Sequence, residues 1–330
     1  MKSLKVRVFA VGCGIWLTSL GLVAAEQMVG IDAESLIRVS PKEVKGILWD
    51  VWASPDGDFV AVGEGGLIVF RDDTGWTERS RGLAISLRGV WGAASDDVFV
   101  VGLSGAILHF DGSTWQVVHK DGPTLYSVWG DSGSNVFVVG SGGVILHYDG
   151  AAWSPMASGV GVDLVAVHGT SSSNVFAVGT AGTVIRYDGA EWSRIDGGLP
   201  PADFTTVWVA SADDAFVAGG GGFIGRFNGR GWSSMLSGTA DQILDLVGVS
   251  AEEVYAVTMH HEVLRFDDGR WSLLGRTKAR FWPWSLAISA SGEGVIVGFV
   301  GEFVYPARDL PPVVTSGTGG IVHFNSEVPR

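Results

Sequence analysis

Cysteine is almost absent from this chain, since Cys13 is the only one among its 330 residues. It lies inside an N-terminal segment with the features of a cleaved secretory signal, so the mature chain is expected to contain none. Disulfides, thiolate metal sites and cysteine nucleophiles are then excluded together.

Basic residues are also few. The chain has 22 Lys+Arg against 35 Asp+Glu, which gives a formal net charge of −13. Because neutralisation of phosphates drives the binding of DNA and RNA, an acidic chain without a basic block is not expected to bind nucleic acid. Only 17% of the residues are charged and 46% are hydrophobic, which is typical of a folded chain rather than a disordered one.

Residues 1–25 have the pattern of a signal peptide. Three basic residues (Lys2, Lys5 and Arg7) precede an apolar stretch over 8–23, and Val23-Ala24-Ala25 forms a small-residue cleavage site before Glu26. We expect export to the periplasm, the extracellular space or the cell surface, with no membrane span in the mature chain. Retention of the segment as an anchor and lipidation at Cys13 stay open as alternatives.

Internal repetition is the strongest feature of the sequence. Runs such as Asp97-Val98-Phe99-Val100-Val101-Gly102 recur in steps of 38 to 40 residues and end at Gly63, Gly102, Gly140, Gly179, Gly219, Thr258 and Gly298. Eleven residues before these anchors lie Trp52, Trp91, Trp129, His168, Trp208, Val247 and Ala287. Thirteen residues after the first six anchors lie Trp76, Trp115, Trp153, Trp192, Trp232 and Trp271.

Each repeat predicts four short strands, named a to d. In the second repeat they cover 87–92, 98–101 and 106–110, and the fourth begins near Trp115. A unit of this size cannot bury both of its faces alone, so neighbouring units must stack. The sequence therefore predicts an all-β fold, a seven-bladed β-propeller of four-stranded antiparallel blades over residues 26–310, with the repeats at about 47–305.

The two chain ends are expected to complete the ring. The seventh repeat lacks a strand-d Trp, and counting back from Trp52 by one d–a spacing reaches Ile37, so residues 35–40 are predicted to form the outer strand of the seventh blade. The C-terminal tail, 311–330, contains Gly319-Gly320-Ile321-Val322-His323-Phe324, which imitates strand c. It follows the seventh repeat too closely for an eighth blade, so we expect an appended extra strand.

One repeat carries a family resemblance. Val128-Trp129-Gly130, Asn135-Val136-Phe137-Val138-Val139-Gly140 and Ile145-Leu146-His147-Tyr148-Asp149-Gly150, followed by Trp153, resemble the repeats of bacterial secreted WD40/YVTN/BNR-like propellers. This broad group includes photosystem II assembly-factor-like proteins. The resemblance covers residues 47–305 and implies the propeller fold, but it implies no single activity.

Two turn motifs invite catalytic interpretations that their context opposes. Gly-x-x-Gly after strand b resembles a phosphate loop, and Gly220-x-Gly222-x-x-Gly225 matches a dinucleotide fingerprint, but no helix follows. We expect glycine to supply positive φ in b–c turns. Asp-Gly or Asn-Gly before strand d (at Asp111, Asp149, Asp188 and Asn228) favours a hairpin turn. A glycosidase needs carboxylates in unequal roles, so these identical turns predict no enzyme.

Two rings of polar residues also follow from the repeat. One holds Asp58, Asp97, Asn135, Asn174, Asp214, Glu253 and Glu293, and the other, in strand c, holds His109, His147, Arg186, Arg226 and Arg265. We interpret both as structural, with the acids capping turns and the bases bound to them. The repeated Trp residues are interpreted as core layers, and His168 as a buried neutral histidine with one partner. No cofactor and no metal are expected.

These features favour a monomeric, non-enzymatic scaffold that binds a protein or cell-surface partner through rim loops. A lectin-like propeller that binds a glycan is the alternative, and a glycoside hydrolase or lyase is a further one.

The partner site is expected where the repeat is broken. In the sixth repeat the glycine turn becomes Thr258-Met259-His260-His261, followed by Glu262, and the next loop contains Arg276, Lys278, Arg280, Trp282 and Trp284. Strand alternation places both segments on one face, and Arg and Trp often carry interface energy. Alternatively, these repeats are degenerate copies at the closure seam, with Trp284 buried like Trp49. Adjacent histidines on a strand point to opposite faces, which opposes a shared metal.

Overall fold

The computed structural model describes residues 37–38, 46–72, 75–80, 84–277, 281–304 and 313–325. The chain forms two compact units, residues 1–30 and 31–330, and the first lies wholly outside the described residues, as does the expected signal peptide. None of the helices in the described ranges has the length and apolar character that a membrane span requires.

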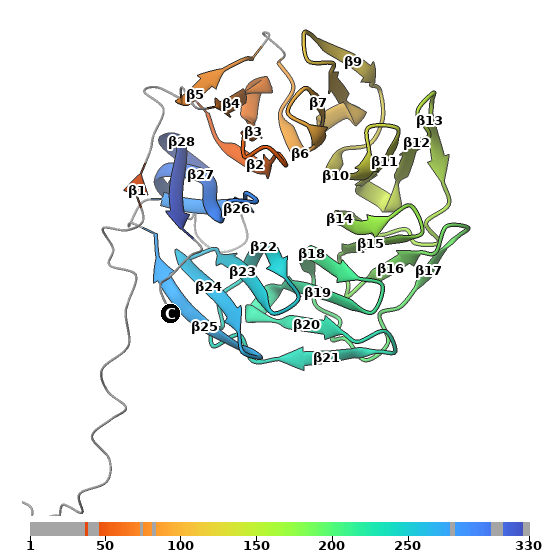
Figure 1. The fold of residues 1–330 in the computed structure, drawn as a ribbon. Coiled ribbons are helices and arrows are strands. Elements are labelled where there is room, and N and C mark those ends of the chain that lie inside the picture. Colours follow the sequence, from red (N-terminus) through yellow and green to blue (C-terminus); the bar gives the residue numbers. More distant parts are fainter. Residues whose placement is uncertain are drawn as a thin grey trace, which may run out of the picture. The chain divides into compact units, whose positions relative to one another are not determined.

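Residues of the second unit form seven four-stranded antiparallel sheets around a common axis (Figure 1), which confirms the predicted seven-bladed propeller. Blade 1 holds β2 (Leu48–Ala53), β3 (Phe59–Gly63), β4 (Ile68–Asp72) and β5 (Gly75–Glu78). Blade 2 holds β6 (Leu87–Ala94), β7 (Asp97–Gly102), β8 (Ile107–Phe110) and β9 (Trp115–His119). Blade 3 holds β10 (Leu125–Ser132), β11 (Asn135–Gly140), β12 (Ile145–Tyr148) and β13 (Trp153–Met156).

The next three blades repeat this order. Blade 4 holds β14 (Leu164–Ser171), β15 (Asn174–Gly179), β16 (Val184–Tyr187) and β17 (Trp192–Arg194). Blade 5 holds β18 (Phe204–Ser211), β19 (Asp214–Gly219), β20 (Ile224–Phe227) and β21 (Trp232–Met235). Blade 6 holds β22 (Ile243–Ser250), β23 (Glu253–Thr258), β24 (Glu262–Asp267) and β25 (Arg270–Arg276). In each blade strand a lies nearest the axis (Figure 1).

Blade 7 is built from both ends of the unit. Its order is β26 (Phe281–Ile288), β27 (Glu293–Val304), β28 (Val313–Asn325) and β1 (Ile37–Arg38). Ile37 pairs with His323 and Arg38 with Val322, so the prediction that the N-terminal segment forms the outer strand is confirmed at these two residues.

The C-terminal strand is not appended, contrary to the expectation from spacing. It is strand c of blade 7, because β28 lies between β27 and β1. The spacing between motifs gave the wrong prediction because strands b and c of this blade are extended into a long hairpin. Strand c therefore begins later in the sequence than in the other blades. The motif match was the correct signal: Ile321 pairs with Val297 as Ile107 pairs with Val101 in blade 2.

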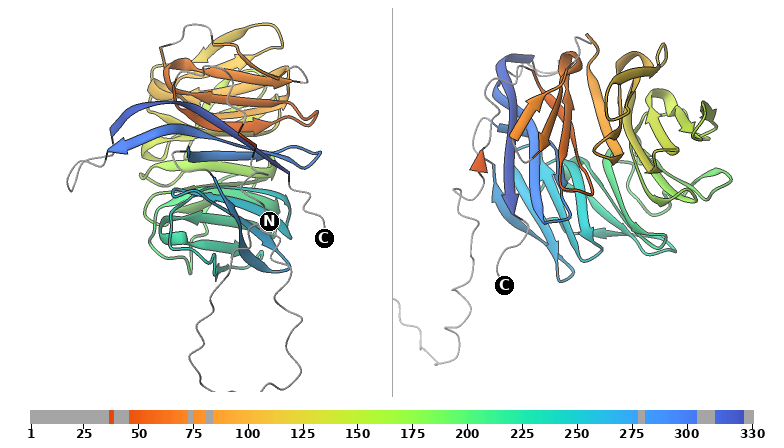
Figure 2. Two further views of the ribbon diagram at one scale, coloured as in Figure 1. Left: turned by 90° about the vertical axis from the view of Figure 1, so that its left-hand side faces the viewer. Right: turned by 45° about the horizontal axis from the view of Figure 1, so that its top comes forward.

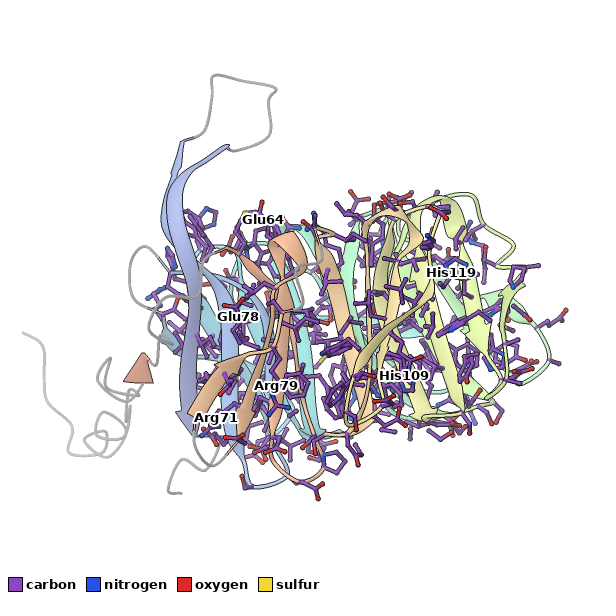
Figure 3. The ribbon with its side chains drawn as sticks, turned by 90° about the horizontal axis from the view of Figure 1, so that it is seen from above. Glu64, Arg71, Glu78, Arg79, His109 and His119 are labelled. Carbon is purple, nitrogen blue, oxygen red and sulfur yellow. The ribbon has the colours of Figure 1, made fainter. Side chains whose placement is uncertain are left out.

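The ring has two faces. Turns between strands a and b and between c and d lie on one, named the a–b face, and the b–c turns and d–a loops lie on the other, named the b–c face. The β27–β28 hairpin projects beyond the neighbouring blades (Figure 2). Viewed from above, it extends past the ring on the side that carries Glu64 of the first b–c turn (Figure 3), so it belongs to the b–c face.

The b–c turns use glycine in two different ways. Four of them contain a short 3-10 turn: η1 (Glu64–Gly66), η2 (Leu103–Gly105), η3 (Ser141–Gly143) and η4 (Gly220–Gly222). The last glycine of the motif has positive φ, for example 68° at Gly105, which confirms the predicted turn role. The first glycine is extended, but a Cβ at Gly102 would lie 2.3 Å from the Ser86 carbonyl oxygen. Strands flank these turns, so the phosphate-loop context is absent from them.

Candidate functional site

The predicted partner site is partly assembled on the b–c face of blades 6 and 7. The ring of His261 lies 5.1 Å from that of Trp282, and its Nδ1 lies 2.6 Å from the carbonyl oxygen of Phe281. The ring of His260 lies 6.0 Å from Trp282, and its Nδ1 contacts Asp241 Oδ1 at 2.6 Å. The structure therefore brings both histidines and Trp282 together.

Of the three cations predicted for this site, the structure describes Arg276. Arg276 donates to Glu262 at 2.7 Å, and its side chain is 61% exposed. Glu262 therefore offsets the charge of Arg276. Lys278 and Arg280 lie outside the described residues. In the described part of the chain, no three His, Cys, Asp or Glu side chains gather as a metal-binding group.

Trp284 lies apart from this cluster. It is in the innermost strand of blade 7, where its ring is 4.9 Å from that of Trp49 in blade 1. The guanidinium of Arg88 in blade 2 stacks over Trp49 at 4.2 Å. Both Trp rings are half-buried. Trp284 thus occupies the position equivalent to Trp49, as the alternative reading expected.

The innermost strands also hold a carboxylate pair that the repeat pattern does not predict. The hydroxyl of Ser285 in blade 7 lies 2.7 Å from Asp50 Oδ1 of blade 1 and 2.8 Å from Asp245 Oδ2 of blade 6. Desolvation, with the nearby charge of Asp245, raises the pKa of Asp50 to about 7. Desolvation also raises the pKa of Asp245. One hydroxyl proton cannot serve both contacts, so a shared proton on the carboxylates fits this geometry.

All four oxygens of the pair accept hydrogen bonds from the protein. The amides of Val90 and Val51 donate to Asp50 at 2.8 and 2.9 Å. Asp245 accepts from the Thr206 hydroxyl and from the amides of Leu246 and Leu286, at 2.8 to 3.0 Å. Since these donors come from blades 1, 2, 5, 6 and 7, the pair ties neighbouring blades together. The only sequence signal was a lone Asp in an apolar strand.

Other blades carry the same link with neutral side chains. Ser127 accepts from the amide of Val167 in the next blade at 3.2 Å, and Thr206 accepts from Leu246 at 3.3 Å. Asp50, Ser127, Thr206, Asp245 and Ser285 occupy one strand-a position, which follows from their pairing with strand b. This belt of hydrogen bonds joins blades near the axis.

The two polar rings of the a–b face contact each other in several blades, as predicted, whereas in blade 4 Asn174 Oδ1 and Arg186 Nε have no hydrogen-bond partner within the described part of the chain. His109 Nε2 lies 2.6 Å from Asp97, Arg226 donates to Asp214 at 2.7 and 2.9 Å, and Arg265 donates to Glu253 at 3.1 Å. His109 also stacks on Phe99, with ring centroids 4.2 Å apart. The repeated Asp-Gly turns are equally self-contained, because Asp111 accepts from the amides of Ser113 and Thr114.

The repeated tryptophans pack between blades. Trp192 and Trp271 of strand d are 8% exposed, and Trp129 and Trp208 of strand a are 7% and 8% exposed. His168 is neutral: its Nδ1 accepts from the amide of Val209 at 3.1 Å, and burial lowers its pKa to about 4. The core interpretation is confirmed for these residues.

No family model and no curated protein sequence matches the chain. Among solved structures, the chain is similar to "YCF48 bound to D1 peptide", with a TM-score of 0.71, 13% identity, and coverage of 90% of this chain and 99% of that one. The chain is also similar to "YCF48 from Cyanidioschyzon merolae", with a TM-score of 0.66, 14% identity, and coverage of 88% of this chain and 99% of that one. For the WD40 β-propeller domain of Doa1 the TM-score is 0.69 and the identity 12%, with coverage of 88% of this chain and 96% of that one. The chain thus shares the fold of WD40-type and YCF48 propellers.

Proposed function

We propose that this protein is a secreted or periplasmic, non-enzymatic scaffold that binds a protein or cell-surface partner through the b–c face of blades 6 and 7. The observation that carries the proposal is the departure of this sector from the repeat. Elsewhere a compact glycine turn closes strands b and c, whereas here His260, His261 and Trp282 gather beside the projecting β27–β28 hairpin.

The chemistry of the sector suits protein recognition. Trp282 is half-buried, so its position is fixed while part of its ring stays accessible, and the side chain of His260 is 59% exposed. Rigid aromatic side chains provide much of the binding energy at protein interfaces. A propeller of the same fold, YCF48, has been solved with a peptide bound, which supports a peptide or protein as the class of partner.

The binding test compares a substitution at the half-buried Trp282 with one at an exposed residue of another blade. Trp282→Ala should abolish or strongly reduce crosslinking to the partner in envelope extracts, because it removes the aromatic anchor. Val117→Ser is the matched control, since Val117 is 47% exposed on the outer strand of blade 2. Equal capture by both variants and the unaltered protein would place the partner elsewhere.

Export is tested separately. Mass spectrometry of protein recovered from the periplasm or medium should give an N-terminus at Glu26. Recovery only from the cytoplasm, with an intact N-terminus, would refute export without bearing on the binding face.

A further inference from the structure

The a–b end of the central channel holds a cavity of about 230 Å³ with an aromatic wall. Five consecutive blades supply the aromatic side chains from one strand-a position: Trp52, Trp91, Trp129, His168 and Trp208. The rest of the lining is Val, Ala, Leu and Ile. No acidic, Lys or Arg side chain lines the cavity among the described residues.

Glycines in strand a of the next blade leave the space that the indole rings occupy. A Cβ at Gly92 would lie 2.7 Å from the ring of Trp52, and one at Gly130 would lie 2.7 Å from the ring of Trp91. Each ring therefore lies against the strand of the next blade. Trp52 and Trp91 keep an accessible part, since both are only half-buried while they line the cavity.

The aromatic wall is continuous through His168. The rings of Trp129 and Trp208 lie 5.9 and 6.4 Å from that of His168. Because Nδ1 of His168 accepts from a backbone amide, its ring proton lies on Nε2. The low pKa of His168, caused by burial, keeps this ring uncharged at neutral pH. The wall therefore presents aromatic surface with no positive charge.

The turns that surround this end of the channel are acidic. Asp56, Asp96 and Asp213 are exposed in the a–b turns of three blades, and Asp131 is exposed near the end of β10, beside the a–b turn of a fourth. None of these four carboxylates forms an ion pair among the described residues. Arg226 and Arg265 on the same face are already bound to Asp214 and Glu253. A cation approaching the cavity is therefore attracted by four exposed carboxylates, which raises its local concentration.

We propose that this cavity binds a small quaternary ammonium compound. The faces of indole rings attract cations, and the attraction strengthens when the site is shielded from water. A cavity below the ~300 Å³ of typical drug-sized pockets suits a compact headgroup. A sugar would need several directional polar side chains, whereas the side chains that line this cavity are aliphatic or aromatic. The site is independent of the partner face, which lies at the opposite end of the channel.

The test uses choline and its uncharged isostere, 3,3-dimethylbutan-1-ol, titrated into the full chain while tryptophan fluorescence and heat are recorded. Saturable choline binding, about tenfold tighter than binding of the isostere, is the expected result. Binding of choline should also weaken as NaCl rises, because the acidic turns are screened. Equal affinity for the two compounds, or no saturable choline binding, would overturn the proposal.

Matched variants locate the site. Trp91→Phe keeps an aromatic core side chain but weakens cation–π attraction, so choline affinity should fall several-fold while the isostere is unaffected. Trp115→Phe makes the same change in strand d of blade 2, away from the cavity, and should leave choline affinity unchanged. Thermal melts establish that both variants are folded. The same choline affinity in both would contradict this location.

Discussion

At the residue scale, the Asp50–Ser285–Asp245 bridge differs from the equivalent links in other blades because it contains two carboxyl groups. A carboxyl group whose pKa is higher in the folded than in the unfolded chain stabilises the fold only while it is protonated. For Asp50 the interval runs from about 4 in the unfolded chain to about 7 in the folded one. The free energy of unfolding should therefore fall as the pH rises through this interval.

The variant Asp50→Ser tests this linkage. Serine accepts a hydrogen bond from the next blade at the equivalent Ser127, so the inter-blade link is retained while the ionisable group is removed. The unaltered protein should lose up to roughly 1.4 kcal/mol per pH unit from this group between pH 4 and 7. The variant should lose less, because only Asp245 of the pair then keeps a raised pKa. Urea unfolding across this range gives the slopes.

Asp111→Ser provides the control. The pKa of Asp111 is lowered by hydrogen bonds from the amides of Thr114 and Ser113, so this group titrates below the interval. The free energy of unfolding of Asp111→Ser should therefore change with pH between 5 and 7 as steeply as that of the unaltered protein. If the free energy of unfolding of Asp50→Ser depends on pH as steeply as that of Asp111→Ser and of the unaltered protein, then Asp50 does not titrate as expected.

At the element scale, regular blades were predictable and the irregular one was not. The sequence placed strands over 87–92 and 98–101, and β6 and β7 cover both segments. Short turns make this possible because the spacing between motifs then follows the strand order. In blade 7 a long hairpin separates β27 from β28, so the spacing failed although the Ile321 motif was present.

The candidate sites were predictable only in part, for a related reason. Loss of the glycine turn at His260 and His261 is visible as a break in a pattern, and the structure does bring these residues to Trp282. The ion pair of Arg276 with Glu262 and the bridge at Asp50 depend on contacts between strands and between blades. No periodicity encodes such contacts.

The b–c turn gives an element-scale prediction. Gly102→Ala should destabilise the protein more than Gly142→Ala. A Cβ at Gly102 would lie 2.3 Å from the Ser86 carbonyl oxygen, whereas a Cβ at Gly142 would have no atom within 4 Å. The cost at Gly142 is therefore only the backbone strain of an alanine at a φ of 66°. Ala181 already occupies the position equivalent to Gly142, with φ 56°. We expect about 1 kcal/mol for Gly142→Ala and a larger loss for Gly102→Ala.

Thermal and urea unfolding of the two glycine variants provide the measurement. Losses of equal size would mean that the extended glycine is not held against strand a, and that positive φ alone explains the motif.

At the scale of the whole molecule, one blade joins the ends of the propeller unit. Strand β28 pairs with β27 on one side and with β1 on the other. Its side chains also enter the core on both sides of the blade: Ile321 packs in a cluster with Leu48 of blade 1, and Val322 packs in one with Tyr255 of blade 6. The tail therefore contributes to both interfaces at the closure.

Ile321→Ala tests whether the tail is structural. Ile321 is fully buried and occupies the same register as Ile107, which is equally buried in blade 2. Removing such a side chain from a packed core costs about 2–5 kcal/mol. We expect Ile321→Ala and Ile107→Ala to lower the free energy of unfolding by similar amounts, in a single cooperative transition. A loss below ~0.5 kcal/mol for Ile321→Ala, with the full cost at Ile107, would mean that the ring closes without the tail.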